Sequence, residues 1–153
     1  MPLFSVMDNS LRRKSKRDYI RYLGRAPKPF AISIPRLAIN ETSYIIIVTR
    51  GHRDDMRVLK LAIATPARYI AMIGSKRKVL NVIKELEKEG LPRADFERIH
   101  APMGLAIGAI TPEEIAISVA AEMIAVRRNP SSNWRAAAMS VFAGESRPAV
   151  LSK

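Results

Sequence analysis

The chain has 153 residues, enough for one domain with a buried core, and 48% hydrophobic and 26% charged residues are typical of a globular protein. It has no cysteine, which excludes disulfides, thiolate metal sites and cysteine nucleophiles and fits a reducing cytoplasm. The net charge is +12, and no apolar run reaches the roughly 18 residues of a membrane-spanning helix.

Half of this charge lies in residues 1–33, where eight lysines and arginines outnumber two aspartates by six. We predict a basic arm here, with a short helix over 11–23 that ends before Pro27 and Pro29. Such a block is usually solvated and in some proteins contacts nucleic acid or an anionic surface. The first residues lack the pattern of a secretory signal.

Residues 34–129 are predicted to form an α/β domain. The continuous β-branched run 44–48 is typical of a parallel strand covered on both faces. A helix from Asp54 or Asp55 to Ala64 follows, and the mostly apolar run 69–73 predicts a second strand. Strand, helix and strand form a βαβ unit, whose right-handed crossover brings both strand ends to one sheet edge.

The second strand is predicted to turn into a helix at Gly74 and Ser75. Glycine allows close backbone approach to a ligand, and Ser75 can cap a helix that ends at Gly90. The free N–H groups of a first helical turn attract anions, and a run of three basic residues, 76–78, adds positive charge. Two interpretations remain open: an anion-binding turn, or an ordinary turn with a solvated basic helix start.

The last long helix is predicted to run from Pro112 to about Arg128. Thr111 is its N-cap, and Glu114 completes a capping box. Its polar stripe is narrow, so we expect its apolar side chains to pack broadly against the sheet or a second copy of the chain.

Two shorter regions flank that helix. Before it, residues 91–98 predict a helical turn, and Ile99-His100 predicts a strand that leads into a loop ending at Gly104. After it, residues 130–153 are interpreted as a tail in which Trp134, Val141 and Phe142 dock onto the domain.

Several motifs together resemble one family, the carboxyl-terminal Rossmann-like domain of xanthine dehydrogenase accessory proteins of the XdhC/CoxI type. The resemblance covers about residues 42–129, in the order and at the spacing of the family. The motifs are Ile46-Ile-Val-Thr-Arg-Gly-His52, Thr65-Pro-Ala-Arg-Tyr-Ile70, Met72-Ile-Gly-Ser-Lys-Arg-Lys-Val79, His100-Ala-Pro-Met-Gly-Leu105, Ile107-Gly-Ala-Ile-Thr-Pro-Glu-Glu-Ile-Ala-Ile117 and Ala121-Glu-Met-Ile-Ala-Val-Arg127.

The resemblance implies an incomplete Rossmann-like domain with three layers and a small, mostly parallel sheet. It also implies a chaperone for the molybdenum cofactor (molybdopterin), rather than an enzyme, that serves a molybdenum hydroxylase together with a sulfur-donor protein. Homo-oligomers, or a companion half of the same type, are expected. The first βαβ unit of the family, with its glycine-rich turn, has no match in residues 1–41, which argues against NAD(P) binding.

The candidate cofactor site combines the loops that follow three strands. Guanidinium, ammonium and helix N–H groups there suit a phosphate or a pyranopterin phosphate. We predict no catalytic residue, and with only two histidines and no third ligand at a recognisable spacing, no metal site. The candidate cofactor-binding residues are Arg50, Gly51, His52, Gly74, Ser75, Lys76, Arg77, His100 and Gly104.

Three alternatives to a cofactor chaperone remain open. One is a nucleotide-binding Rossmann domain of an oxidoreductase, and another is an electrostatic nucleic-acid-binding protein, although no DNA-binding motif is present. The third is a truncated, non-functional copy, because two or three parallel strands leave a hydrophobic sheet edge exposed.

Overall fold

A computed structural model of the chain describes residues 3–7, 21–22, 38–49, 51–128 and 132–142. Its five-stranded sheet has the order β2-β1-β3-β4-β5. The strands are β1 (Leu3–Met7), β2 (Arg21–Tyr22), β3 (Tyr44–Val48), β4 (Tyr69–Met72) and β5 (Ile99–His100). The helices are α2 (His52–Ile63), α3 (Lys76–Lys88), α4 (Arg93–Phe96), α5 (Pro112–Arg128) and the 3-10 helix η3 (Ser132–Ala137).

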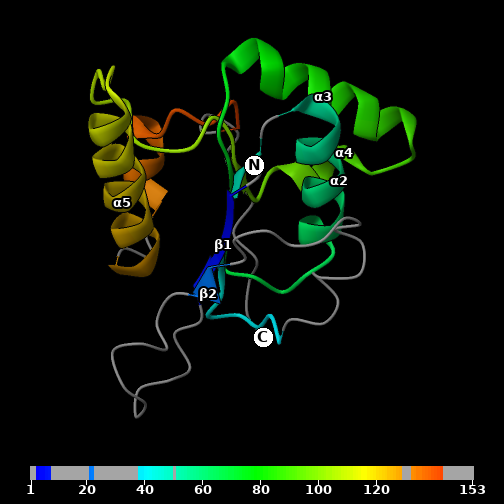
Figure 1. The fold of residues 1–153 in the computed structure, drawn as a ribbon, viewed down its shortest axis with the longest axis horizontal. Coiled ribbons are helices and arrows are strands. Elements are labelled where there is room, and N and C mark those ends of the chain that lie inside the picture. The colour runs from blue at the N-terminus through cyan, green and yellow to red at the C-terminus, as the bar shows by residue number, and fades with distance from the viewer. Residues whose placement is uncertain (1–2, 8–20, 23–37, 50, 129–131, 143–153) are drawn as a thin grey trace.

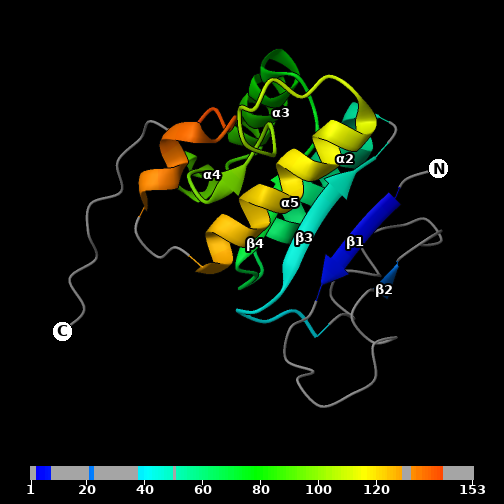
Figure 2. The same cartoon turned by 90° about the vertical axis from the view of Figure 1, so that its left-hand side faces the viewer.

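The elements stack in three layers, which confirms the predicted incomplete Rossmann-like α/β fold (Figure 1). The strands β3, β4 and β5 are parallel, with Ile45 opposite Ile70 and Ile70 opposite Ile99. The helices α2, α3 and α4 cover one face of this sheet, and α5 with η3 covers the other (Figures 1 and 2). Among the described residues, no helix is long and apolar enough to span a membrane.

The strands and helices predicted within residues 34–129 are present with small shifts at their ends. The strand at 44–48 is confirmed, and the second strand ends at Met72, one residue earlier than predicted. The helix expected from Asp54 or Asp55 begins at His52, because the carbonyl of Gly51 already accepts the N–H groups of both aspartates. The α3 helix has Ser75 as its N-cap, as predicted.

Each face of the sheet has its own hydrophobic core. The larger core lies under α2, α3 and α4, and fully buried Ile45, Ile70 and Leu86 belong to it. The smaller core lies under α5 and contains Tyr44, Tyr69, Ala71, Met103 and Val119. The central strand β4 is buried along its whole length, as the continuous apolar run predicted.

The predicted basic arm contributes two strands to the sheet, which differs from the expected boundary at residue 33. Strand β1 pairs with β3 in antiparallel orientation along all five residues, and β2 pairs with the other side of β1. The helix expected over 11–23 falls mainly outside the described residues, but its last part is strand β2 rather than helix. The edge of the parallel sheet at β3 is therefore covered by β1.

The tail residues named in the sequence do dock, as predicted. Phe142 belongs to the larger core with 2% of its surface exposed, and the Val141 N–H donates to the Ala101 carbonyl at 2.9 Å. Trp134, at the start of η3, stacks on His100. Residues 132–142 thus pack with the predicted domain 34–129 rather than forming a separate tail.

The orientation of α5 shows that only part of its apolar surface packs against the sheet, one of the two partners predicted for it, and the other partner, a second copy of the chain, stays a prediction. Its polar residues Ser118 and Glu122 are fully buried against the sheet. By contrast, Ile117 and Ile124 are 63% and 62% exposed. The helix is apolar on nearly every side, so its sequence pattern did not determine which side faces inward.

Candidate functional site

The loops after β3, β4 and β5 meet at one edge of the sheet, as the parallel order predicts. The Ile73 N–H donates to the Ile47 carbonyl at 3.1 Å, and the Met103 N–H donates to the Met72 carbonyl at 3.1 Å. These bonds tie the end of each strand to its neighbour. Gly51 lies at this edge as the N-cap of α2, whereas Arg50 and the side chain of His52 lie outside the described residues.

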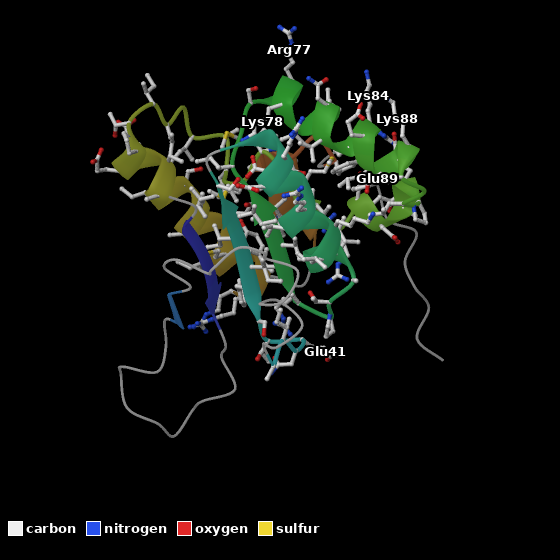
Figure 3. The ribbon with its side chains drawn as sticks, turned by 45° about the vertical axis from the view of Figure 1, so that its right-hand side comes forward. Glu41, Arg77, Lys78, Lys84, Lys88 and Glu89 are labelled. Atoms are coloured by element: carbon white, nitrogen blue, oxygen red, sulfur yellow. The ribbon has the colours of Figure 1, made fainter. Side chains whose placement is uncertain are left out.

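The start of α3 is an exposed, positively charged part of this edge. The Ser75 hydroxyl accepts the N–H of Lys78 at 3.2 Å, which caps the helix, and the Lys76 and Arg77 side chains are exposed. Figure 3 shows Arg77 at the amino end of α3, pointing away from the body of the protein. A Cβ atom at Gly74 would lie 2.9 Å from the Lys78 side chain, so glycine fits this turn closely. This arrangement can attract an anion from solvent.

Lys78 does not share this outward orientation. Its Nζ lies 2.5 Å from Asp55 Oδ2, and the Asp55 side chain is fully buried. The Thr49 hydroxyl donates to the other Asp55 oxygen at 2.5 Å. The buried carboxylate of α2 therefore holds Lys78 of α3, and of the basic run 76–78 only the first two cations remain available to a ligand.

A buried polar network lies on the opposite face of the sheet, between β4, β5 and α5. The Glu122 carboxylate accepts the Tyr69 hydroxyl at 2.5 Å and the Gly104 N–H at 2.8 Å through Oε2. Its other oxygen lies 3.0 Å from His100 Nδ1. His100 is 6% exposed and Glu122 is fully buried. The network fixes the loop after β5 to α5.

Aromatic rings enclose this network. The rings of Tyr69 and His100 have centroids 4.5 Å apart, and the Trp134 ring stacks on His100 with a centroid distance of 5.8 Å. Tyr44 packs against Tyr69 at 5.6 Å, and its buried hydroxyl has no hydrogen-bond partner among the described residues. The packed rings leave His100 oriented toward Glu122 rather than toward the sheet edge.

The network changes the acidity of its members. Burial, and then the negative charge of Glu122, raise the pKa of Tyr69 well above its ordinary value, so this hydroxyl stays protonated and donates. Burial alone would raise the pKa of Glu122. Hydrogen bonding and charge from His100, with further bonds from Tyr69 and Gly104, outweigh burial and hold that pKa below its ordinary value. Glu122 is therefore an ionised acceptor at neutral pH.

Gly104 is required where the loop crosses α5. Its φ is +103°, a backbone conformation that side chains disfavour, and an added Cβ would lie within van der Waals overlap of the Ser118 hydroxyl. That hydroxyl donates to the Leu105 carbonyl at 2.7 Å. Gly104 thus serves close packing of the loop on the helix.

The described candidate residues fall into two groups, one at the exposed edge of the sheet and one in the buried network on its α5 face. Residues 74–77 and Gly51 form the exposed edge, while His100 and Gly104 join Glu122 in the interior. Sequence reasoning missed Tyr69 and Glu122 as polar partners. The pattern that could have identified Glu122 is its spacing from Ser118, two polar residues one turn apart in an otherwise apolar helix. Within the described residues, no group of three or more side chains could hold a metal ion.

A family model described as the XdhC Rossmann domain matches residues 6–123. This match begins upstream of residues 42–129, where the motifs of the sequence lie, and includes the end of β1. It therefore covers most of the described fold, including the exposed edge and the buried network.

Three longer proteins are similar to this chain. The uncharacterized protein YqeB of Escherichia coli (strain K12) is 35% identical over 100 residues, 65% of this chain and 18% of that protein. A probable xanthine dehydrogenase component of Bacillus subtilis (strain 168) is 32% identical over 83 residues, 54% of this chain and 23% of that protein. A xanthine dehydrogenase from Bacillus halodurans, known from a crystal structure, superposes on this chain with a TM-score of 0.55 and 29% sequence identity. The matched region is 66% of this chain and 28% of that protein. The chain thus spans less than a third of each relative.

Proposed function

Because the chain belongs to the XdhC Rossmann-domain family, we propose that it is an accessory protein that binds molybdenum cofactor for insertion into a xanthine dehydrogenase-type molybdenum hydroxylase. The observation that carries this proposal is the family match over residues 6–123. The names of the two Bacillus relatives, which both refer to xanthine dehydrogenase, support the association with this class of enzyme.

The exposed edge suits the phosphate of the cofactor. The first N–H groups of α3 have no intrahelical partner, and Lys76 and Arg77 are exposed beside them. Lysine and arginine together can neutralise a phosphate dianion, and arginine can bind it with two parallel hydrogen bonds. The Glu122 network, by contrast, is buried, and its part is to hold the loop after β5 in position.

The chain acts in this proposal as a carrier rather than as a catalyst. The cofactor supplies the redox chemistry once it reaches the hydroxylase, and the chain binds, shields and transfers it. A sulfur-donor protein and a companion of the same family are the further partners. We assign this role to the cytoplasm, with which the cysteine-free composition is compatible.

An equilibrium titration of the full chain with molybdopterin tests the proposal. We expect saturable binding, and we expect the double variant Lys76→Glu with Arg77→Glu to weaken it at least about tenfold, which corresponds to roughly 1.4 kcal/mol. The control is Lys84→Glu, an exposed lysine further along the same helix (Figure 3). It makes a charge change of the same kind away from the helix start.

Two outcomes would overturn the proposal. One is the absence of saturable binding, both for the chain alone and in the presence of an XdhC-type companion. The other is saturable binding of NAD or NADP in a parallel titration without binding of molybdopterin, which would identify a nucleotide-binding domain instead. Equal weakening by the control variant would keep cofactor binding but remove the start of α3 as its site.

A further inference from the structure

The outer face of α5 is an apolar surface on a helix that is otherwise packed against the sheet. In Figure 2 this helix lies in front of the sheet, and no described element lies in front of it. Ile117 and Ile124 on this face are more than 60% exposed, and Ala120 between them is also exposed. Ile107 and Ile110, in the loop that leads into the helix, are 56% and 85% exposed. Such a concentration of exposed isoleucine is typical of an interaction surface.

The exposed residues follow the spacing of a helix-to-helix contact. Their positions alternate steps of four and three residues, which places them in one stripe along the helix. We call this set the α5 stripe: Glu113, Ile117, Ala120, Ile124 and Arg127. The stripe has an acidic residue at its amino end, a small residue in the middle and a basic residue at its carboxyl end.

We propose that the α5 stripe binds the same stripe of a second copy of this chain, with the two helices antiparallel around Ala120. Glu113 and Arg127 are each seven residues from Ala120, so a two-fold axis there places each of them opposite the other type in the second copy. The same axis places Ile117, three residues from Ala120, next to Ile124 of the second copy, four residues from Ala120, with an offset of one residue along the helix. The small Ala120 side chain lets the two helices approach closely at the axis.

Charge selects this arrangement over the alternatives. A parallel pair would place Glu113 beside Glu113 and Arg127 beside Arg127, which is repulsive. The antiparallel pair converts both repulsions into attractions and aligns the two helix dipoles favourably. Neither side chain has an ion-pair partner within the part of the chain that the structure describes, so both are available to a second copy. This inference does not depend on cofactor binding.

The dimer is expected to be reversible. Two helices of 17 residues make a small contact compared with the roughly 1,200–2,000 Å² that stable protein complexes bury. Sedimentation over a wide concentration range should show the average mass rising from 17.1 kDa toward twice that value. Ile124→Glu should keep the chain monomeric at every concentration, with an unchanged circular dichroism spectrum because the residue is on the surface.

A charge exchange tests the antiparallel geometry. Glu113→Arg alone and Arg127→Glu alone should each weaken the dimer about tenfold or more, and the double variant should restore it. If the α5 stripe instead bound a different protein, the double variant would not recover binding, because the charges of that protein would be unchanged. Failure of the double variant to dimerise, while both single variants are folded, would overturn the antiparallel pairing.

A single introduced cysteine gives an independent measurement, because the chain has none of its own. Ala120→Cys should form a disulfide-linked dimer under mild oxidation, since the two-fold axis brings the two sulfur atoms together. The matched control, Lys84→Cys on the exposed side of α3, should remain monomeric. Equal cross-linking of both variants, or a wild-type chain that stays monomeric at all concentrations, would overturn the proposal.

Discussion

Glu122 joins three separate parts of the chain through one buried carboxylate. One oxygen accepts both the Tyr69 hydroxyl of β4 and the Gly104 N–H of the loop after β5, and the other lies 3.0 Å from Nδ1 of His100 of β5. A buried charge costs folding free energy unless hydrogen bonds replace its lost water, and here all three partners do so. The stability of the α5 face of the sheet therefore depends strongly on one side chain.

Replacing Glu122 with glutamine should test this dependence. Glutamine has the same shape but no charge, and its NH₂ group must face either the two donors Tyr69 and Gly104 or the Nδ1 of His100, which would then have to accept. We expect the free energy of unfolding to fall by about 2–4 kcal/mol in chemical denaturation, the range for breaking a buried, charge-assisted network. The control Glu41→Gln removes an exposed charge at the opposite end of the molecule from Arg77 (Figure 3) and should change stability by less than about 0.5 kcal/mol.

The Glu122→Gln variant and its control also test how the free energy of unfolding depends on pH. The pKa of Glu122 in the folded chain lies below its ordinary value of 4.5, so between these two values the unfolded chain binds more protons than the folded chain. The stabilisation is complete above pH 4.5 and is lost as pH falls through the lower, folded-state pKa. The Glu122→Gln variant should lack this part of the acid dependence. An acid limb identical to that of the wild-type chain would contradict the assignment.

The sequence identified His100 and Gly104 as neighbours at a sheet edge but not the direction of the His100 side chain. Side chains alternate between the two faces of a strand, so a shift of one residue exchanges the faces. In β5 the Ile99 side chain joins the larger core, and His100 points to the α5 side. A strand of two residues contains too short a pattern to predict this choice.

At the scale of elements, local hydrogen bonding explains why the helix ends could be predicted. Glu114 Oε2 accepts the Thr111 N–H at 3.0 Å, and the Thr111 hydroxyl accepts the Glu114 N–H at 3.3 Å, which confirms the capping box at α5. Only nearby residues take part in this motif. The rotation of α5 about its own axis depends instead on distant partners, Tyr69 and His100, and so could not be predicted from the helix itself.

The contact between α2 and α3 offers a comparison of two lysines. Lys78 pairs with Asp55, which is fully buried, whereas Lys60 of α2 pairs at 2.6 Å with Glu89 just beyond α3, and both of these side chains are over 40% exposed. We expect Lys78→Met to lower the free energy of unfolding by about 3–5 kcal/mol, because it leaves a buried carboxylate without its counter-ion. Lys60→Met should cost at most about 1 kcal/mol.

Thermal and chemical unfolding of both variants would measure this difference, and the salt dependence of stability would separate the two pairs further. Only the exposed pair should weaken as salt increases. Similar losses for both variants would mean that the Asp55 carboxylate finds another partner when Lys78 is absent. In that case the buried pair would not be what fixes α3 against α2.

For the whole molecule, the parallel part of the fold was predictable and the antiparallel part was not. Strand–helix–strand order, together with the handedness of its crossover, defines how β3, β4 and β5 are arranged. Strand β1, in contrast, lies in a segment whose composition is dominated by positive charge, and its partner is about 40 residues away in the sequence. Pairing over that separation leaves no local pattern, so the sequence did not predict that β1 covers the edge of β3, and an exposed sheet edge remained as the basis of the truncated-copy alternative.

Coverage of β3 by β1 makes a prediction about the integrity of the whole chain. Ser5 is opposite Ile46 of β3 on one side and Tyr22 of β2 on the other, so its N–H is directed to one of two neighbouring strands. Ser5→Pro removes this donor and should detach β1, exposing a row of unpaired groups along an apolar strand. We expect a lower melting temperature and aggregation on light scattering, while Ser5→Thr should behave like the wild-type chain. A soluble, equally stable proline variant would show that the parallel strands and their helices hold together without β1, and that the rest of the sheet is sufficient for folding.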